Sequence, residues 1–459
     1  MGAFRIERDT MGEVRVPAGA LYGAQTQRAV ENFPISNYRF TRPFLHALGL
    51  IKSAAAAVNG RLGTLDPEVA TAIEAAAEEV AAGTHDSQFV VDVFQTGSGT
   101  STNMNANEVI ATLATRILNR PGARVHPNDD VNRGQSSNDV IPTAIHVAAA
   151  ELVRRDLLPA MARLSEELRR KADDFYDVVK IGRTHLQDAV PMRLGQEFRG
   201  YSRQVEASLE RVHAALDWIY ELPIGGTAVG TGLNAPEGFA HGVVHVLSRR
   251  TNLPFREAKD HFEAQAARDG ISFLSGALKS YAVALTKIAN DVRWLGSGPR
   301  CGLGELRLPE VQPGSSIMPG KVNPVIAESV LMACAQVIGH DAAITWCCAM
   351  GNFELNVMMP VMAYDILDSI GLLAASSRNF TDRLVAGLEA DRERARAFVE
   401  QSLAMATALA PEIGYEKAAA IAKEAYASGR TIREVAKEKS GIDPHRLNEL
   451  LDPERQAGE

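Results

Sequence analysis

The chain has 459 residues, of which 46% are hydrophobic, and a net charge of -8 at pH 7. This length suffices for several hydrophobic cores, arranged as two or three domains or as one extended helical unit. The acidic balance argues against a nucleic-acid-binding protein, which normally carries a basic patch, and the lack of an apolar run of about 18 residues argues against a transmembrane helix.

The N-terminus and the cysteines indicate the compartment. The opening letters MGAFRIERDTMGEV have neither the apolar core nor the basic leader of a signal peptide. The 4 cysteines of this long chain lack metal-ligand spacing and are typical of reduced, mostly buried thiols. We therefore expect a cytoplasmic protein with no nucleic-acid or membrane partner.

Apolar residues recur at helical spacing in several long stretches. One stretch begins after Pro142, a favourable first-turn residue, and includes Met161, Leu164 and Leu168. The next contains Val205, Leu209, Val212, Leu216 and Ile219, and the longest contains Leu274, Leu278, Tyr281, Leu285, Ile288, Val292 and Leu295. Each helix must bury its apolar seam against others, so these stretches predict an all-α bundle of long helices. Stripes of this length often continue across a subunit boundary, which favours an oligomer.

The same patterns predict a division into domains. An N-terminal domain of loops and helices would span residues 1–135, the helical bundle residues 136–392, and a small helical domain residues 393–459. In the last of these, Thr431 and Glu434 fit a capping box that opens a short helix.

Polar segments rich in glycine or proline interrupt the helical pattern, and loops of this kind often carry binding groups. In the run TGSGTSTNMN, Thr96 to Asn105, the glycines allow close backbone approach, and the amides and hydroxyls could hold an anion. The run also fits an ordinary loop, and it lacks the Gly-Lys-Ser/Thr of a phosphate-binding loop. In the second segment, His126 to Thr143, the residues Ser136 to Asp139 fit either a helix cap or a carboxylate site at a helix N-terminus.

Two later segments carry groups suited to proton transfer. In GRTHLQDAVPMRLGQEF, His185 lies in a polar loop, and a histidine titrates near physiological pH. In PGSSIMPGKVNPVIAES, Pro313 to Ser329, the lysine Lys321 lies near Ser315, and a nearby cation favours the alkoxide form of a serine. Taken alone, each segment also fits a flexible surface loop.

Together, these segments resemble those of one known family. The loop GSSIMPGKVNP, Gly314 to Pro324, closely resembles GSSxMPxKxNP, the signature of the fumarase/aspartase superfamily. The other segments follow in that family's order, and the resemblance runs from TMGEVRVPAGALYGAQTQRAVENFPIS to IGYEKAAAIAKEAYASG. It implies a three-domain fold whose long central bundle forms the shared core of a homotetramer, with active sites built from three subunits.

Single letters distinguish the branches of the superfamily. Val322 follows Lys321, whereas argininosuccinate and adenylosuccinate lyases usually have a second basic residue there. His185 and Ser137 stand where aspartases typically have glutamine and threonine, although the stretch AVPMRLGQEFR is somewhat aspartase-like. The chain thus resembles a class II fumarase, which implies reversible hydration of fumarate to L-malate. Aspartate ammonia-lyase and a non-catalytic structural relative are the alternatives.

The resemblance also implies roles for individual residues. Ser315 would remove the C3 proton with help from Lys321, while His185, paired with Glu328, would handle the hydroxyl that leaves as water. The implied substrate-binding residues are Ser98, Gly99, Thr100, Ser136, Ser137, Asn138, Thr184, Ser316, Lys321, Val322 and Asn323. The implied residues of a second dicarboxylate site are His126, Pro127, Asn128 and Asp129, a stretch that equally fits a turn. No metal and no other cofactor is expected.

Overall fold

The computed structural model describes residues 3–458, and the chain divides into two compact units whose segments alternate along the sequence. Unit 1 comprises Met1–Pro159, Glu210–Ala282 and Ala335–Ala374, and unit 2 comprises Ala160–Leu209, Val283–Cys334 and Ala375–Glu459. These boundaries differ from those expected near residues 135 and 392, so the three-domain division stays a prediction.

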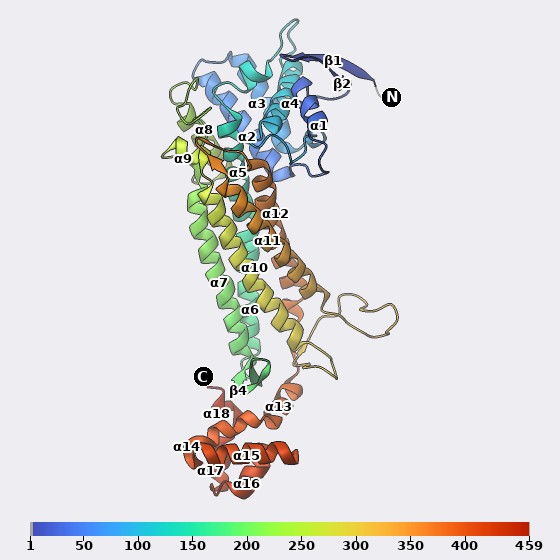
Figure 1. Ribbon diagram of the computed structural model, residues 1–459, viewed down its shortest axis with the longest axis vertical. Helices are drawn as coiled ribbons and strands as arrows, with labels where there is room; N and C mark the ends of the chain where they lie inside the picture. Colours follow the sequence, from blue (N-terminus) through green and yellow to red (C-terminus); the bar gives the residue numbers. More distant parts are fainter. Residues whose placement is uncertain (1–2, 459) are drawn as a thin grey trace. The chain divides into compact units, whose positions relative to one another are not determined.

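Helices form most of the described chain, as predicted (Figure 1). They are α1 (Ala24–Asn32), α2 (Arg42–Arg61), α3 (Pro67–Ala82), α4 (Thr100–Leu118), α5 (Ser137–Leu152), α6 (Leu158–Asp174), α7 (Leu194–Ile219), α8 (Phe239–Thr251), α9 (His261–Ala266), α10 (Asp269–Leu295), α11 (Val325–Ala349), α12 (Met359–Arg383), α13 (Arg392–Gln401), α14 (Ala410–Ile413), α15 (Tyr415–Ser428), α16 (Ile432–Lys439), α17 (Pro444–Leu450) and α18 (Pro453–Gln456).

Strands are short and form only two-stranded sheets within residues 3–458. The antiparallel pairs are β1 (Phe4–Asp9) with β2 (Gly12–Pro17), β3 (Val179–Thr184) with β4 (Gln187–Arg193), β7 (Leu306–Arg307) with β10 (Glu389–Ala390), and β8 (Gly351–Asn352) with β9 (Leu355–Asn356), while β5 (Glu221–Leu222) and β6 (Arg256–Glu257) are parallel.

The apolar stripes predicted from the sequence are the buried seams of the long helices. In α10, the stripe from Leu274 to Leu295 is buried along its whole length, with no member more than 4% exposed. In α7, Val205, Val212 and Ile219 are fully buried. The prediction of long amphipathic helices is therefore confirmed for both segments.

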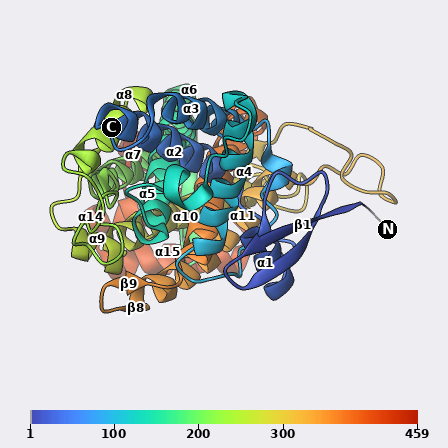
Figure 2. The ribbon, with the colours of Figure 1, turned by 90° about the horizontal axis from the view of Figure 1, so that it is seen from above.

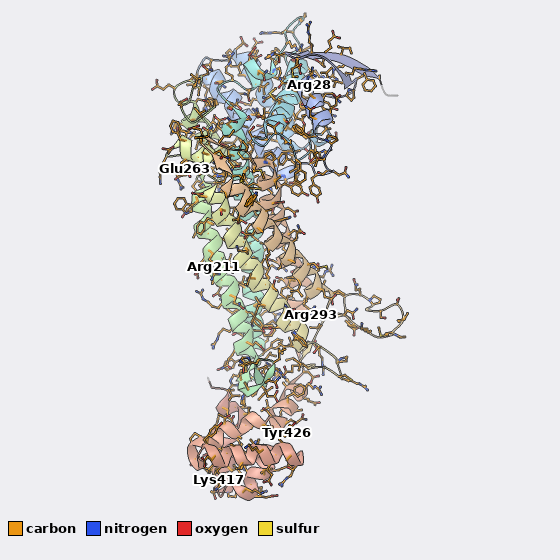
Figure 3. All side chains as sticks on the ribbon, in the orientation of Figure 1. Arg28, Arg211, Glu263, Arg293, Lys417 and Tyr426 are labelled. Atoms are coloured by element: carbon orange, nitrogen blue, oxygen red, sulfur yellow. The ribbon has the colours of Figure 1, made fainter. Side chains whose placement is uncertain are left out.

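In unit 1, α1 lies beside the β1–β2 hairpin, as Figure 2 shows. Arg28 of α1, labelled in Figure 3, joins them through an ion pair with Asp9 at 2.7 Å. The hydrogen bond to Arg28 lowers the pKa of Asp9. The hairpin is thus fixed to the helix by a charge-assisted contact.

The start of α5 corrects one prediction. The helix begins at Ser137 with Ser136 as its N-cap, so Pro142 lies inside the helix and does not open it. Ser136 and Asp139 form a capping box, and this strong start explains the difference. The capping box satisfies the amides of Ser136 and Asn138, so the helix is already formed when it reaches the proline, whose missing N–H affects only one later bond.

In unit 2, the C-terminal helices close around their own core. Ile421 of α15, Val435 of α16 and Leu447 of α17 are buried in one hydrophobic cluster. Thr431 and Glu434 form the predicted capping box at the start of α16. Lys417 of α15, labelled in Figure 3, donates to the Ser440 carbonyl at 2.7 Å.

Two of the helices are unusually long and apolar. Val325–Ala349 and Met359–Gly387 are long and apolar enough to cross a membrane, with mean hydropathies of 1.3 and 1.2, which corrects the expectation that the chain lacks such runs. The core helix of a soluble protein passes the same test, and 61% of the apolar window of the second helix is buried inside the chain. For the first helix the buried share is 39%, so much of its apolar surface is uncovered in a single chain.

Candidate active site

The predicted site residues form two groups, one in each compact unit. Unit 1 holds Ser98, Gly99, Thr100, Ser136, Ser137, Asn138 and the second-site residues His126, Pro127, Asn128 and Asp129. Unit 2 holds Thr184, His185, Ser315, Ser316, Lys321, Val322, Asn323 and Glu328.

In unit 1, a chain of hydroxyl groups joins the first two predicted segments. Thr100 is the first residue of α4, and its hydroxyl lies 2.8 Å from that of Ser98 and 2.7 Å from that of Ser137. Gly99 makes this approach possible, because it has a left-handed backbone (φ 74°) and a Cβ there would lie about 3 Å from Ile141. The structure thus brings residues 98–100 and 136–138 together.

The joined segments are the N-terminal ends of α4 and α5. The first amides of a helix have no partner within the helix, and they carry a partial positive charge that favours a carboxylate. Ser136 uses its side chain to accept the Asn138 amide at 3.2 Å, as an N-cap does. Asn138 donates its side-chain amide to the Ala228 carbonyl at 2.8 Å, so this residue is held by a second segment.

The segment that holds Asn138, residues 225–228, was missed by the sequence reasoning. It is fixed by the buried carboxylate of Asp139, which accepts the amides of Gly225 at 2.9 Å and Thr227 at 3.0 Å. The glycine-rich run GGTAVGTG, residues 225–232, is the signal that could have indicated it.

A buried lysine contacts the residues that precede Ser136 in the chain. Lys52 of α2 is completely buried, and its ammonium donates to the side-chain oxygens of Asn132 at 3.0 Å and Gln135 at 2.9 Å. Burial lowers the pKa of Lys52 to about 7, and burial raises the pKa of Asp139 to about 6. The two groups counteract part of each other's shift by mutual attraction.

In unit 2, His185 lies at the tip of the β3–β4 hairpin. His185 and Leu186 form its two-residue turn, and both have left-handed backbones, with φ of 55° and 59°. Such turns normally use Asn-Gly, because a bulky residue with positive φ is strained. The turn presents an exposed His185, and its base is anchored by Arg183, which donates to Glu305 at 2.7 Å.

The signature loop in unit 2 folds back on itself. The Gly314 amide donates to the Lys321 carbonyl at 2.8 Å, and the Asn323 side-chain amide donates to the Gly314 carbonyl at 2.6 Å. Within this loop, the Ser315 hydroxyl oxygen accepts the amides of Ile317 at 3.2 Å and Met318 at 3.0 Å. Two amide donors favour the ionised form of an oxygen, so the loop has an arrangement suited to a serine alkoxide.

The side chains of the remaining residues of this group form no hydrogen bond or ion pair with one another in the part of the chain that the structure describes. Lys321 and Ser316 are exposed, and Lys321 makes no ion pair within residues 3–458. Glu328 lies in the first turn of α11, and it does not pair with His185 in the described part of one chain. Thr184 ends β3 opposite Gln187 of β4, so it lies directly beside His185.

Of the second-site residues, His126, Pro127 and Asn128 border a cavity of unit 1 of about 740 Å³, whereas Asp129 does not line it. His126 accepts the amides of Asn128 at 3.3 Å and Asp129 at 3.0 Å with its Nδ1 atom, so it caps the turn Pro127–Val131. The cavity is also lined by arginines that the sequence reasoning missed, namely Arg5, Arg8, Arg116 and Arg124.

No metal centre is found in the described residues. Within residues 3–458, no group of three or more histidine, cysteine, aspartate or glutamate side chains could hold a metal ion.

Comparison with known families and proteins gives consistent matches over nearly the whole chain. Residues 12–339 match the family described as Lyase, and residues 405–456 match that described as Fumarase C C-terminus. Class II fumarate hydratase from Mycobacterium tuberculosis is 58% identical over 98% of this chain and 94% of its own length. The enzyme of the same name from Ralstonia nicotianae is 53% identical over 99% of both chains.

Comparison with solved structures gives relatives of the same kind. The crystal structure of class II fumarase from Schistosoma mansoni superimposes with a TM-score of 0.96 at 38% identity, covering 99% of both chains. That of fumarate lyase:delta crystallin from Brucella melitensis bound to cobalt gives a TM-score of 0.94 at 45% identity, covering 99% of this chain and 100% of its own.

Proposed function

Because the chain belongs to the class II fumarase family of the fumarase/aspartase superfamily, we propose that it catalyses the reversible hydration of fumarate to L-malate. Family membership confirms the resemblance noted in the signature loop. The geometric observation that carries the proposal is the pair of amides, from Ile317 and Met318, that donate to the Ser315 hydroxyl oxygen.

The chemistry requires a proton to leave a carbon next to a carboxylate. In malate dehydration the C3 proton leaves first, and the adjacent carboxylate becomes a dianionic aci-carboxylate. Fixed donors that stabilise this charge supply the largest part of the rate enhancement in such reactions. The site must therefore hold a base, a group of carboxylate-binding donors and an acid for the departing hydroxide.

Ser315 is the proposed base. A neutral serine is a poor base, but the two amides stabilise the alkoxide that would accept the C3 proton. The nearby Lys321 adds a positive charge, and with Ser316, Val322 and Asn323 it would bind a substrate carboxylate. Because the Asn323 amide nitrogen already closes the loop onto Gly314, its oxygen or the adjacent backbone would make that contact.

The hydroxyl chain of unit 1 is the proposed second half of the carboxylate site. Ser98, Gly99 and Thr100 would act together with Ser136, Ser137 and Asn138. The short distances from Thr100 to Ser98 and Ser137 support this assignment, since convergent hydroxyls beside two helix N-termini suit an anion.

His185 is proposed to protonate the departing hydroxide, with Glu328 as its partner and Thr184 beside it. Since one chain does not join His185 to Glu328, the proposal places that contact between subunits. The strained turn at His185 supports a functional role, because unfavourable backbone conformations persist where a site requires them.

The subunits would form a homotetramer, with each active site built from three of them. The support lies on α11, a long and mainly apolar helix that exposes Met332 (68%) and Trp346 (65%) and has only 39% of its apolar window buried inside the chain. A large exposed apolar surface of this kind marks a site of association, so a further copy of the chain would cover it. We also propose that the enzyme is cytoplasmic. In this proposal α11 and α12 are core helices and not membrane spans.

The stretch from His126 to Asp129 is proposed as a second dicarboxylate site. It borders a cavity lined by four arginines and by the carboxylates of Glu7, Asp9 and Glu108, and the support for anion binding is that the arginines outnumber the carboxylates. His126→Ala should weaken fumarate occupancy at this cavity in crystals while most turnover is retained. Unchanged occupancy in the variant would contradict the assignment.

The activity is tested by following fumarate absorbance in the ultraviolet. Purified protein without added metal should raise this absorbance when given L-malate and lower it when given fumarate. A signal with L-aspartate and none with L-malate would assign the enzyme to the aspartases, and no signal with either would favour a non-catalytic structural relative.

A further inference from the structure

The carboxylate of Asp139 connects two segments of unit 1 that are far apart in the sequence. One oxygen accepts the Ser136 amide at 2.9 Å, and the other accepts the amides of Gly225 at 2.9 Å and Thr227 at 3.0 Å. Asp139 is completely buried. A buried carboxylate with three amide donors is a strong and directional connection.

The turn held by Asp139 is strained. Thr227 has a left-handed backbone with φ of 55°, which a β-branched residue rarely adopts. Its hydroxyl is buried and has no hydrogen-bond partner among the described residues. Both features cost free energy, and they persist only where the surroundings fix the conformation.

Several contacts fix this conformation. Gln265 of α9 donates its side-chain amide to the Thr227 carbonyl at 2.8 Å. Gly225 has φ of 100°, and a Cβ there would lie 2.4 Å from Ala240, so only glycine fits. The next residue along the turn, Ala228, presents its carbonyl to the side chain of Asn138.

These contacts hold the proposed carboxylate-binding residues, Ser136 to Asn138, from two sides. Asp139 fixes the backbone at Ser136, and the turn that it also fixes holds the Asn138 side chain from the other side. Lys52, buried in α2, is the cation that faces Asp139 and favours its ionised form. The orientation of Ser136 to Asn138 therefore depends on a residue that is itself too deep to touch substrate.

We propose that Asp139 is a positioning residue for dicarboxylate binding, which sets Ser136 to Asn138 by tying them to the strained turn at residues 225–228. The inference rests on the proposed function, since it assigns substrate binding to Ser136, Ser137 and Asn138. It adds the turn at residues 225–228, which includes Thr227 and lies outside the signature segments, to the residues that determine the affinity for a dicarboxylate.

Asp139→Asn is the direct test. Asparagine has nearly the same shape but offers one acceptor oxygen and a donor in place of the other, so it cannot accept all three amides. We expect the KM for fumarate to rise about tenfold or more, with a smaller change in kcat. Asp341→Asn is the matched control, because it removes another buried carboxylate of unit 1, one bound to Ser275 at 2.7 Å. This control should lower the melting temperature but leave KM unchanged.

Thr227→Gly keeps the test decisive if Asp139→Asn does not fold. Glycine adopts the left-handed backbone without strain, and the variant also lacks the unpaired hydroxyl, so the melting temperature should stay equal or rise. The KM should nevertheless rise several-fold, because the turn loses its fixed geometry. An unchanged KM in the folded variants, or activity lost only in proportion to folded protein, would overturn the proposal.

Calorimetric binding of succinate separates this inference from the proposed function. Succinate is a dicarboxylate that cannot undergo the reaction, so its affinity reports the site alone. If wild-type protein binds succinate but converts neither fumarate nor malate, the function fails while the positioning role is still measured by the Asp139→Asn affinity. Equal succinate affinity in wild type and Asp139→Asn would refute the positioning role.

Discussion

At the scale of single residues, the proposed site is marked by backbone strain. His185, Leu186 and Thr227 are all non-glycine residues with positive φ, and all three lie at or beside residues proposed to bind substrate. A β-branched or bulky side chain in this region costs about 1–3 kcal/mol. At these three positions the strain lies where segments present polar groups in fixed directions, at the hairpin tip and at the turn near Asn138, and outside the proposed site the bulky Phe353 has a similar backbone (φ 52°) in the β8–β9 turn.

Leu186→Gly should reveal the strain of the hairpin tip. The Leu186 side chain is 73% exposed in the chain, so little packing is lost, and glycine adopts φ near 59° without strain. We expect the free energy of unfolding to rise by about 1 kcal/mol, since relief of strain exceeds the entropy cost of glycine. Leu186→Ala keeps the strain, so its free energy of unfolding, measured by chemical denaturation, should show no increase over that of the wild type. Equal stability of the two variants would contradict the account.

At the scale of elements, α2 carries a buried cation that should make stability depend on pH. Burial lowers the pKa of Lys52 to about 7, whereas in the unfolded chain it returns to its ordinary value near 10.5. Between these values the unfolded state binds more protons, so stability rises with pH in this window and is lost as pH falls toward 7. The raised pKa of Asp139, about 6, acts at lower pH, where stability falls as pH rises from about 4 to 6.

Lys52→Met should remove the rise in stability above pH 7. We expect wild-type unfolding free energy to increase between pH 7 and 9 by up to about 1.4 kcal/mol per pH unit. The variant should show a flatter dependence, whatever its absolute stability. Urea unfolding across this range is the measurement, with Lys437→Met, which removes an exposed lysine of α16, as the control. A variant as steep as the wild type would exclude Lys52 as the source.

Sequence patterns predict elements better than they predict connections. The α10 stripe and the Thr431 capping box follow from local spacing, and the structure has both. By contrast, the tie from Asp139 to Gly225 joins residues 86 positions apart, and no local pattern encodes such a contact. Pro142 led to a wrong start for α5, because the capping box at Ser136, six residues earlier, is strong enough to keep a proline inside the helix.

At the scale of the whole molecule, the proposed active site is incomplete in one chain. Within one chain the signature loop already holds the Ser315 hydroxyl by the amides of Ile317 and Met318, and the sequence pattern alone indicated this loop as a candidate site. Within residues 3–458 of one chain His185 does not pair with Glu328, and under the proposed function this contact would form between subunits. The exposed apolar side chains of α11 are where the proposed neighbouring subunits would pack.

Met332→Lys should disrupt the assembly. Met332 is 68% exposed in the chain, so a lysine there is tolerated by the isolated subunit but would be buried without a partner in the oligomer. Analytical ultracentrifugation should show subunit association weakened by at least about tenfold, with turnover lost in parallel. Tyr426→Lys, at a site on α15 that is 77% exposed, should leave assembly unchanged. An intact, active Met332→Lys oligomer would contradict the shared-site account.

The central claim is that Ser315, held by two loop amides, is the base of a fumarate hydratase, and Ser315→Ala tests it most directly. Turnover of L-malate should be compared by fumarate absorbance in wild-type and variant protein of equal oligomeric state and melting temperature. The account predicts a loss of roughly 10²–10⁴-fold in turnover, as expected for removal of a general base. Near-normal turnover in the folded variant would remove Ser315 from the mechanism.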